Sequence, residues 1–226
     1  MDFSGPGDLV LLRKLRADNR PLILPRGAFA WRDSSTYHLD LRLNSALRPQ
    51  VRHHLQRTER KLKREVGELQ LVEVGDEDKE KWLEEWAHHM QVRYPKAPLL
   101  SARHLPIVTK WLLGASLDPW IKLFVLRAGC RPLAWALCYE WRNVFYLFSP
   151  IMSSDPNLAK YGPGKLLTHH LICRARARGL LTFDFLQGQH DYKLQWQPQE
   201  VPLMSCFVPL NRRGALATRL FSLRKC

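Results

Sequence analysis

Alternating apolar and polar positions mark two stretches in the first third of the chain as strands. TYHLDLRL, residues 36–43, places an apolar side chain at every second position, and ELQLVEV, residues 68–74, alternates similarly over its first four residues. A period of two is typical of a strand that turns one face toward a core. DLVLLR, residues 8–13, is a further short strand candidate, although no neighbouring segment is an obvious partner for it.

Apolar residues at helical spacing predict helices elsewhere. In the stretch 46–66, Leu47, Val51, Leu55, Leu62 and Val66 form one stripe, with Asn44 or Ser45 available as a cap. Four later segments are also predicted to be helices, and Gly179 is the C-terminal stop of the third one. They run from Gly75 through His89, over 104–115, over 165–179 and over 214–225.

The middle of the chain predicts an antiparallel meander. Three strand-like runs, 121–128, 132–140 and 143–150, follow one another with only tight turns between them. A polar loop then leads into the helix at 165–179, and two further strands are expected at 182–187 and 201–210. The order is therefore three strands, a glycine-containing loop, a helix, a strand, a loop and a last strand, and it constrains where the chemistry can lie.

Charge adds a constraint on partners. The chain has 35 Lys and Arg against 21 Asp and Glu, a net charge of +14. Such a field attracts RNA or DNA, an acidic carrier protein, an anionic membrane surface or a phosphate-rich cofactor, although it also serves plain solubility. The arginines and lysines of the helix at 46–66 crowd the faces away from its apolar stripe. This one-sign surface favours an anionic partner.

Other features exclude some classes of protein. The chain has no apolar run of about 18 residues and no secretory signal, so we expect a cytoplasmic protein without a transmembrane segment. Its five cysteines show no CxxC spacing and are expected to be reduced and mostly buried. Adjacent histidines, as at His53 and His54, point away from each other on a helix, so no metal site is expected.

Two short segments carry the candidate chemistry. Gly162-Pro163-Gly164 stands where a strand passes into a helix, and backbone N–H groups at a helix start favour a phosphate, although a tight turn alone would also use these residues. FDFLQGQHDYKLQW, residues 183–196, ends an apolar strand in a series of polar and ionisable groups. A strand end of this kind is expected at the rim of a ligand cleft.

These two segments resemble the GNAT acyltransferases, in particular the CelD-like and FemAB-like branch (BioF-type acetyltransferase domain). That branch has a pG-x-x-L helix start followed by a strand of the form fDfg-G-x-x-x-YK-x-x-W. The arginine-rich HLQRTERKLKREVG and the hairpin RAGCRPLAWAL are similar to further segments of it. The matching residues are Pro163, Gly164, Leu167, Phe183, Asp184, Phe185, Gly188, Tyr192, Lys193 and Trp196.

The resemblance implies an α/β (α+β) fold, the GNAT fold, with a central mixed, mostly antiparallel sheet flanked by helices. It covers most of residues 36–210, which we expect to form the acyltransferase domain. Residues 1–35 are similar to the last strand and linker of a first GNAT-like half, and 211–226 form a basic C-terminal helix.

The implied reaction is direct attack of an amine acceptor on an acyl group held by acyl-CoA or an acyl carrier protein, without a covalent enzyme intermediate or a metal. A backbone N–H of the strand at 143–150 is expected to face the carbonyl. One alternative is a FemAB-like transferase that uses aminoacyl-tRNA as an anionic macromolecular donor. Another is a non-catalytic module that binds nucleic acid.

The resemblance also suggests roles for particular residues. Asp184 would orient a base or be structural, Tyr192 would give a proton to the leaving group, and Lys193 would pair with a phosphate or carboxylate unless it is a surface lysine. His190 is a further candidate base because histidine is the side chain most suited to exchanging a proton near neutral pH.

The donor site is expected at the glycine turn. The branch has Gln or Arg where this chain has Ala159, so Lys160 or Lys165 would supply the positive charge beside Gly162 and Gly164. Asp155 and Tyr161 are candidates for acceptor contacts. Arg57, Arg60 and Arg64 are candidates for binding a macromolecular donor.

Overall fold

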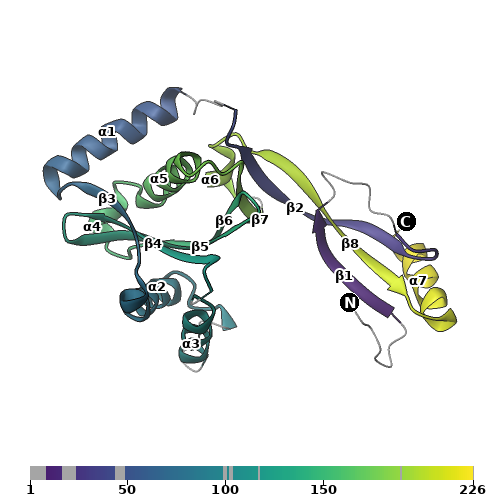
Figure 1. Cartoon of the computed structure of the whole chain (residues 1–226). Helices are drawn as coiled ribbons and strands as arrows, with labels where there is room; N and C mark the ends of the chain where they lie inside the picture. Colours follow the sequence, from purple (N-terminus) through teal and green to yellow (C-terminus); the bar gives the residue numbers. More distant parts are fainter. Residues whose placement is uncertain are drawn as a thin grey trace. The chain divides into compact units, whose positions relative to one another are not determined.

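The computed structural model describes residues 9–16, 24–43, 49–98, 101, 104–116, 118–188 and 190–225. These residues form two compact units. Unit 1 comprises 1–37, 187–190 and 199–226, and unit 2 comprises 38–186 and 191–198. Figure 1 labels the strands and helices of both units.

Unit 2 is built on a mixed sheet with the strand order β7-β6-β5-β4-β3. The strands are β3 (Leu69–Glu73), β4 (Ile121–Ala128), β5 (Arg131–Trp141), β6 (Val144–Met152) and β7 (Thr182–Gln187). Strands β4, β5 and β6 form the expected antiparallel meander, and β3 joins its edge antiparallel to β4. Arg142 and Asn143, with φ of 47° and 64°, make the tight turn before β6. Strand β7 is parallel to β6, which makes the sheet mixed.

Helices cover both faces of this sheet (Figure 1). Helices α2 (Lys79–Arg93) and α3 (Leu105–Ser116) cover one face, where Leu83, Trp86 and Leu112 pack against Leu123 and Trp135 of the strands. Helix α5 (Pro163–Ala177) contacts β3, β4, β5 and β6. The remaining helices of unit 2 are α1 (Pro49–Glu65), the 3-10 turn η1 (Asp76–Asp78), and the short α4 (Pro156–Ala159) and α6 (Asp191–Leu194).

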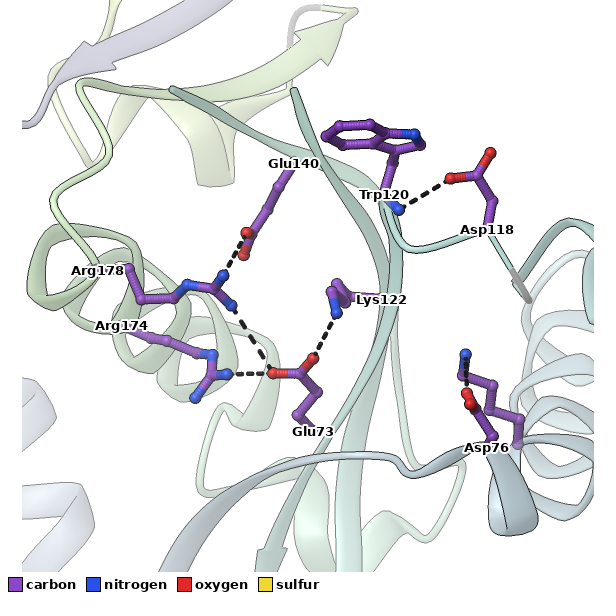
Figure 2. A network of polar contacts seen from close by, with 9 residues as sticks. Glu73, Asp76, Asp118, Trp120, Lys122, Glu140, Arg174 and Arg178 are labelled. Carbon is purple, nitrogen blue, oxygen red and sulfur yellow. Dashed lines mark hydrogen bonds and ion pairs between the residues drawn. The ribbon is translucent and has the colours of Figure 1, made fainter. Parts of the chain in front are cut away.

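A polar network ties the C-terminal end of α5 to three strands (Figure 2). Glu73 of β3 pairs with Lys122 of β4 at 3.0 Å and with Arg174 of α5. Arg178, just after α5, pairs with Glu140 of β5 at 3.1 Å and approaches Glu73 to 4.0 Å. Because these groups are partly buried, the network anchors the helix whose other end forms the glycine turn.

Unit 1 joins distant parts of the chain. Strand β1 (Leu9–Arg16) pairs antiparallel with β8 (Gln199–Pro209), from Leu9 opposite Pro209 to Arg16 opposite Leu203. The partner that the sequence did not reveal for the first strand therefore comes from the other end of the chain. Strand β8 also neighbours β2 (Phe29–Asp40), and α7 (Arg212–Lys225) contacts β8. Four partly buried aromatic rings pack against one another in this unit: Phe29, Trp31, Phe207 and Phe221.

Some element limits differ from the sequence-based expectation. Strand β2 starts at Phe29 rather than 36, because Phe29 and Trp31 at its start pack against Phe221 of α7. It ends at Asp40, whose carboxylate accepts the N–H of Arg42 at 3.0 Å and turns the chain. The cap candidates Asn44 and Ser45 lie outside the described residues.

The cysteines also differ from expectation. Cys138 and Cys206 are buried, but Cys130 and Cys173 are exposed, so the expectation of mostly buried cysteines is wrong for two of the four that the structure describes. Cys130 lies in the turn between β4 and β5, and Cys173 lies on the outer side of α5.

Candidate functional site

The glycine turn starts α5. Gly162 is left-handed, with φ of 55°, and its carbonyl accepts the N–H groups of Lys165 and Leu166 at 2.9 and 3.3 Å. Pro163 takes the first helical position, where its missing N–H costs nothing. A Cβ built on Gly164 would meet no atom within 4 Å, so there is open space above this backbone. Pro163 has no N–H and Lys165 and Leu166 donate theirs to Gly162, so the turn offers a phosphate the N–H of Gly164 and the positive end of the helix dipole.

A cleft of about 330 Å³ in unit 2 opens beside this turn. Its walls come from the end of β6, the segment between α4 and α5, the first turns of α5, the end of α2 and α6. The lining residues are Arg93, Tyr94, Pro150, Ile151, Met152, Ala159, Gly162, Gly164, Lys165, Thr168 and Tyr192.

Strands β6 and β7 separate where the cleft begins. Their parallel pairing runs from Val144 opposite Thr182 to Tyr146 opposite Asp184, whereas β6 itself continues to Met152. Pro150 lies in this continuation, and a proline is tolerated there because it has no N–H to leave unpaired. The parting of two parallel strands leaves one edge of β6 open to a ligand.

A β-bulge in strand β6 shifts which of its residues face the open edge. Leu137 of β5 pairs with Ser149 and Cys138 pairs with Leu147, so Phe148 is an inserted bulge residue. Beyond the bulge, the N–H of Ser153 donates to Leu133 of β5 at 2.8 Å. Successive N–H groups of a strand point to opposite edges, so that of Met152 points toward the side where β7 has separated. It is positioned to donate to an oxygen in the cleft.

The end of β7 is shaped by two buried ionisable residues. Asp184 accepts the N–H of Leu186 at 2.7 Å, and the ammonium group of Lys193 donates to the carbonyl of the same residue at 3.1 Å. Both side chains are 2% exposed. Burial lowers the pKa of Lys193 to about 8, although the charge of Asp184 acts in the opposite direction. Lys193 is therefore not the surface lysine that the sequence left open.

Tyr192 is a lining residue of the cleft, next to Lys193 in α6. Burial raises its pKa to about 12, and neighbouring Tyr94 adds to the rise. The phenol therefore keeps its proton at neutral pH and can donate it. Tyr94 follows the last residue of α2, and nothing in the sequence pattern around it indicated that it would meet a residue almost a hundred positions later.

Tyr161 and Asp155 hold the segment before α5. The hydroxyl of Tyr161 donates to Glu65 of α1 at 2.6 Å, and its ring is 4% exposed. Asp155 caps α4 by accepting the N–H of Asn157 at 2.8 Å. These contacts fix the loop, whereas the acceptor contacts suggested for both residues stay a prediction.

Basic side chains surround the segment before α5. Lys160 approaches Glu65 to 3.9 Å and lies over the ring of Tyr161, with its nitrogen 4.9 Å from the centroid. On α1, the buried face consists of Leu55, Thr58 and Leu62, whereas Arg57, Arg60 and Arg64 are exposed. The structure thus places a solvent-facing basic surface on the helix that contacts the segment before α5 through Glu65 and Tyr161.

His89 is a positioning residue that sequence reasoning missed. Its Nδ1 accepts the backbone N–H of Ser154 at 3.2 Å and lies 3.0 Å from the hydroxyl of the same residue, at the start of the loop that leads to the glycine turn. Burial, with a smaller contribution from His88, lowers the pKa of His89, so the ring stays neutral and able to accept. Only the packing of α2 against β6 creates this contact.

His190 belongs to unit 1 and is exposed. A Cβ on Gly188, whose φ is 98°, would lie 3.1 Å from its Nε2, so the imidazole folds back over its own loop. Its suggested role as a base stays a prediction.

Two general features of the described residues bear on cofactors. No group of three or more His, Cys, Asp and Glu side chains among them is arranged to hold a metal ion. No helix within the described ranges is long and apolar enough to cross a membrane.

Several solved structures are similar to this chain. The structure of L-PGS from Bacillus licheniformis has a TM-score of 0.61 and 12% identity, and the match covers 94% of this chain and 72% of that one. FemX has a TM-score of 0.59 at 11% identity. The C-terminal domain of a putative lysylphosphatidylglycerol synthetase from Agrobacterium fabrum has a TM-score of 0.57 at 14% identity.

The matches to FemX and to the Agrobacterium domain each cover 84% of this chain but only 64% of the other. At these identities the likeness shows a shared fold. A search of curated proteins finds no match.

The family model of the acetyltransferase (GNAT) domain matches residues 49–194, which include the glycine turn, the cleft and both buried ionisable residues of the β7 end. The expected α/β fold with its mixed, mostly antiparallel sheet is confirmed as well. The chain therefore belongs to the acetyltransferase (GNAT) domain family.

Proposed function

We propose that the protein transfers an acyl group from acyl-CoA, or from the phosphopantetheine arm of an acyl carrier protein, to an amine acceptor. The observation that carries this proposal is the left-handed glycine turn at the start of α5, which opens into the cleft beside the unpaired edge of β6. A phosphate oxygen of the donor would accept the N–H of Gly164 near the positive end of the helix dipole, and Lys165 would add a positive charge.

The acyl carbonyl would lie against the open edge of β6. The amine nitrogen attacks this carbon, the N–C bond forms and the C–S bond of the thioester breaks. The N–H of Met152 would stabilise the developing oxyanion. Tyr192, protonated because its pKa is about 12, would give its proton to the departing thiolate. The amine proton leaves to solvent, and the phenol regains a proton from solvent.

The two buried ionisable residues at the end of β7, Asp184 and Lys193, would support the site. Asp184 supports the β7 end through Leu186 and would hold Lys193 in its cationic form. That cation would lie near the donor's carbonyl or phosphate. The acceptor would meet the loop that Asp155 and Tyr161 hold.

Gly164 provides a direct test of the donor site. Because a Cβ there meets no protein atom, Gly164→Ala should leave the fold intact while filling the space that a phosphate needs. Acetyl-CoA at a hundred times its Kd should stabilise the wild type by about 2.7 kcal/mol, a rise in Tm of roughly 5–10 °C. Pantetheine, which lacks the pyrophosphate, should give a smaller rise, and Gly164→Ala should lose most of the acetyl-CoA effect.

Gly114 of α3 offers a matched control. A Cβ at this position also meets nothing within 4 Å, but it lies away from the cleft lining. Gly114→Ala should therefore keep the full acetyl-CoA shift. If Gly164→Ala binds acetyl-CoA as the wild type does, the glycine turn is not the donor site.

A second donor class is favoured by α1. Its exposed arginines suit a large anionic donor, either a carrier protein or, as the FemAB-like alternative, aminoacyl-tRNA. The triple variant Arg57→Glu, Arg60→Glu and Arg64→Glu should abolish turnover with such a donor and leave turnover of free acyl-CoA nearly unchanged. Equal loss with both donors would mean that the basic face of α1 is structural. Salt-sensitive nucleic-acid binding without any turnover would favour the non-catalytic alternative.

A further inference from the structure

Helix α7 of unit 1 carries an apolar stripe on the side opposite its packed face. Phe221 contacts Trp31 and Phe207, and Thr218 is 3% exposed, so these residues mark the inward side. Leu216, Leu220 and Leu223 are 62%, 57% and 76% exposed. At about 100° per residue, Leu220 and Leu223 lie within roughly 40° of Leu216 around the helix, so the three form one stripe.

Arginines border this leucine stripe on both sides. Arg213 and Arg219 lie about 60° to either side of Leu216, and Arg212 lies on the same side as Arg219. All three arginines are exposed. The helix sequence RRGALATRLFSLRK contains five basic residues and no acidic one. An apolar stripe with long cationic side chains at its edges is the arrangement of a helix that lies in a membrane interface, where the guanidinium groups reach the headgroups.

The charge decides between two possible occupants of the stripe. A second copy of α7 would cover the leucines, but it would bring five further positive charges against the first five, which opposes association. An anionic lipid surface covers the leucines and compensates the arginines at the same time. The net charge of +14 on the whole chain acts in the same direction.

We propose that α7 binds the surface of an anionic membrane, with Leu216, Leu220 and Leu223 in the acyl boundary and Arg212, Arg213 and Arg219 at the lipid phosphates. The observation that carries it is the stack of exposed leucines between arginines, opposite a packed face. This binding is independent of the acyl transfer proposed for unit 2. It would keep the protein at a membrane surface.

The test is flotation of the full chain with vesicles of phosphatidylcholine containing roughly a quarter phosphatidylglycerol, compared with vesicles of phosphatidylcholine alone. The wild type should bind the anionic vesicles and bind the neutral ones far less. Leu216→Ser/Leu220→Ser/Leu223→Ser should weaken binding by at least about a hundredfold, because each leucine contributes about tenfold. Arg212→Gln/Arg219→Gln should weaken it about 25-fold, since each arginine contributes about fivefold. These side chains are exposed, so both variants should keep the wild-type Tm.

Two controls separate α7 from general effects. Arg57→Gln/Arg60→Gln removes the same charge from α1, and Ile107→Ser/Trp111→Ser removes exposed apolar surface, 66% and 68% exposed, from α3. Both control variants should bind the anionic vesicles much more tightly than the corresponding α7 variants do. The proposal is overturned if the leucine variant floats with the anionic vesicles like the wild type, or if the wild type does not bind them. It is also overturned if the α1 variant loses as much vesicle binding as the α7 arginine variant. A leucine-dependent dimer in light scattering, without vesicle binding, would identify a second copy as the occupant instead.

Discussion

Asp184 and Lys193 bind the two polar groups of one backbone residue: the carboxylate accepts the N–H of Leu186 and the ammonium group donates to its carbonyl. Leu186 has a φ of 60°, a left-handed conformation that costs a leucine about 1–2 kcal/mol. The two hydrogen bonds hold this conformation where β7 ends. The two buried charged side chains therefore stabilise the backbone conformation at the end of β7.

We expect the Asp184 and Lys193 substitutions to be strongly non-additive. Asp184→Asn removes the compensating charge of a buried ammonium and should lower the free energy of unfolding by about 3 kcal/mol. Lys193→Met removes a costly buried charge together with one hydrogen bond and should cost about 1 kcal/mol. The double variant should recover part of the Asp184→Asn loss. Urea unfolding of all four proteins gives the coupling, and simple addition of the two losses would show that the charges do not interact.

The pH dependence of activity should report the charge of Lys193. If the cation serves the reaction, kcat/KM falls as pH rises through about 8, the pKa of the buried ammonium. Lys193→Arg, which keeps its charge, should shift this fall to higher pH. The free energy of unfolding should behave in the opposite way and rise between about pH 8 and 10.5, because there the unfolded chain binds the proton that the folded protein has released. A pH profile identical in Lys193→Arg would assign the fall to another group.

Glu73 should be a centre of stability for unit 2. Glu73→Gln weakens its pairs with Lys122, Arg174 and Arg178 and should lower the free energy of unfolding by about 2 kcal/mol. The control Glu68→Gln removes an exposed pair with Lys63 of similar length and should cost about 0.5 kcal/mol or less. Equal losses in chemical denaturation would contradict a special role for the network in Figure 2.

Acid should weaken the same network. Burial acts to raise the pKa of Glu73, but its basic partners together lower it below the ordinary value of 4.5. Its contribution to stability is therefore complete above pH 4.5 and is lost as pH falls through the folded-state pKa. The wild type should lose more stability than Glu73→Gln between about pH 5 and 3. Parallel curves for the two proteins would show that Glu73 has the same pKa folded and unfolded.

His89 should make the loop that leads from β6 to the glycine turn sensitive to mild acid. Its folded-state pKa is below 6.5, so from pH 6.5 downward the unfolded chain takes up a proton more readily and the folded protein loses stability. Protonation of Nδ1 also breaks the bond from the Ser154 N–H. His89→Gln should flatten the fall in Tm and in acetyl-CoA affinity below pH 6.5, whereas His88→Gln, at the exposed neighbour, should not. The same flattening in both variants would assign the effect to general charge.

Local patterns accounted for much of the fold. Strands with an alternating or continuous apolar run, such as β3, β4 and β7, were predicted within a residue or two, because one buried face demands that pattern. The meander followed from its tight turns, and the start of α5 from Gly162 and Pro163. The short α6 was not predicted, since four residues carry no periodic signal.

Long-range pairing was not readable from local patterns. The sequence offered no partner for β1, because antiparallel pairing with β8 joins residues about two hundred positions apart. The cleft likewise combines Arg93 and Tyr94 with Tyr192, and the contact of His89 with Ser154 depends on helix packing. Such groups become neighbours only when the chain closes large loops around a common core.

By itself, then, the sequence determined the periodicity of the elements, the basic surface of α1, the glycine turn, and the motif that places Asp184 and Lys193 together. These properties are encoded within short windows of chain, where backbone geometry and spacing act directly. Tertiary structure alone decided that Lys193 is buried with a pKa near 8, that β6 and β7 part beside the turn, and that the leucines of α7 remain exposed. Burial and charge environment depend on every element that packs around a side chain, and no single window contains that information.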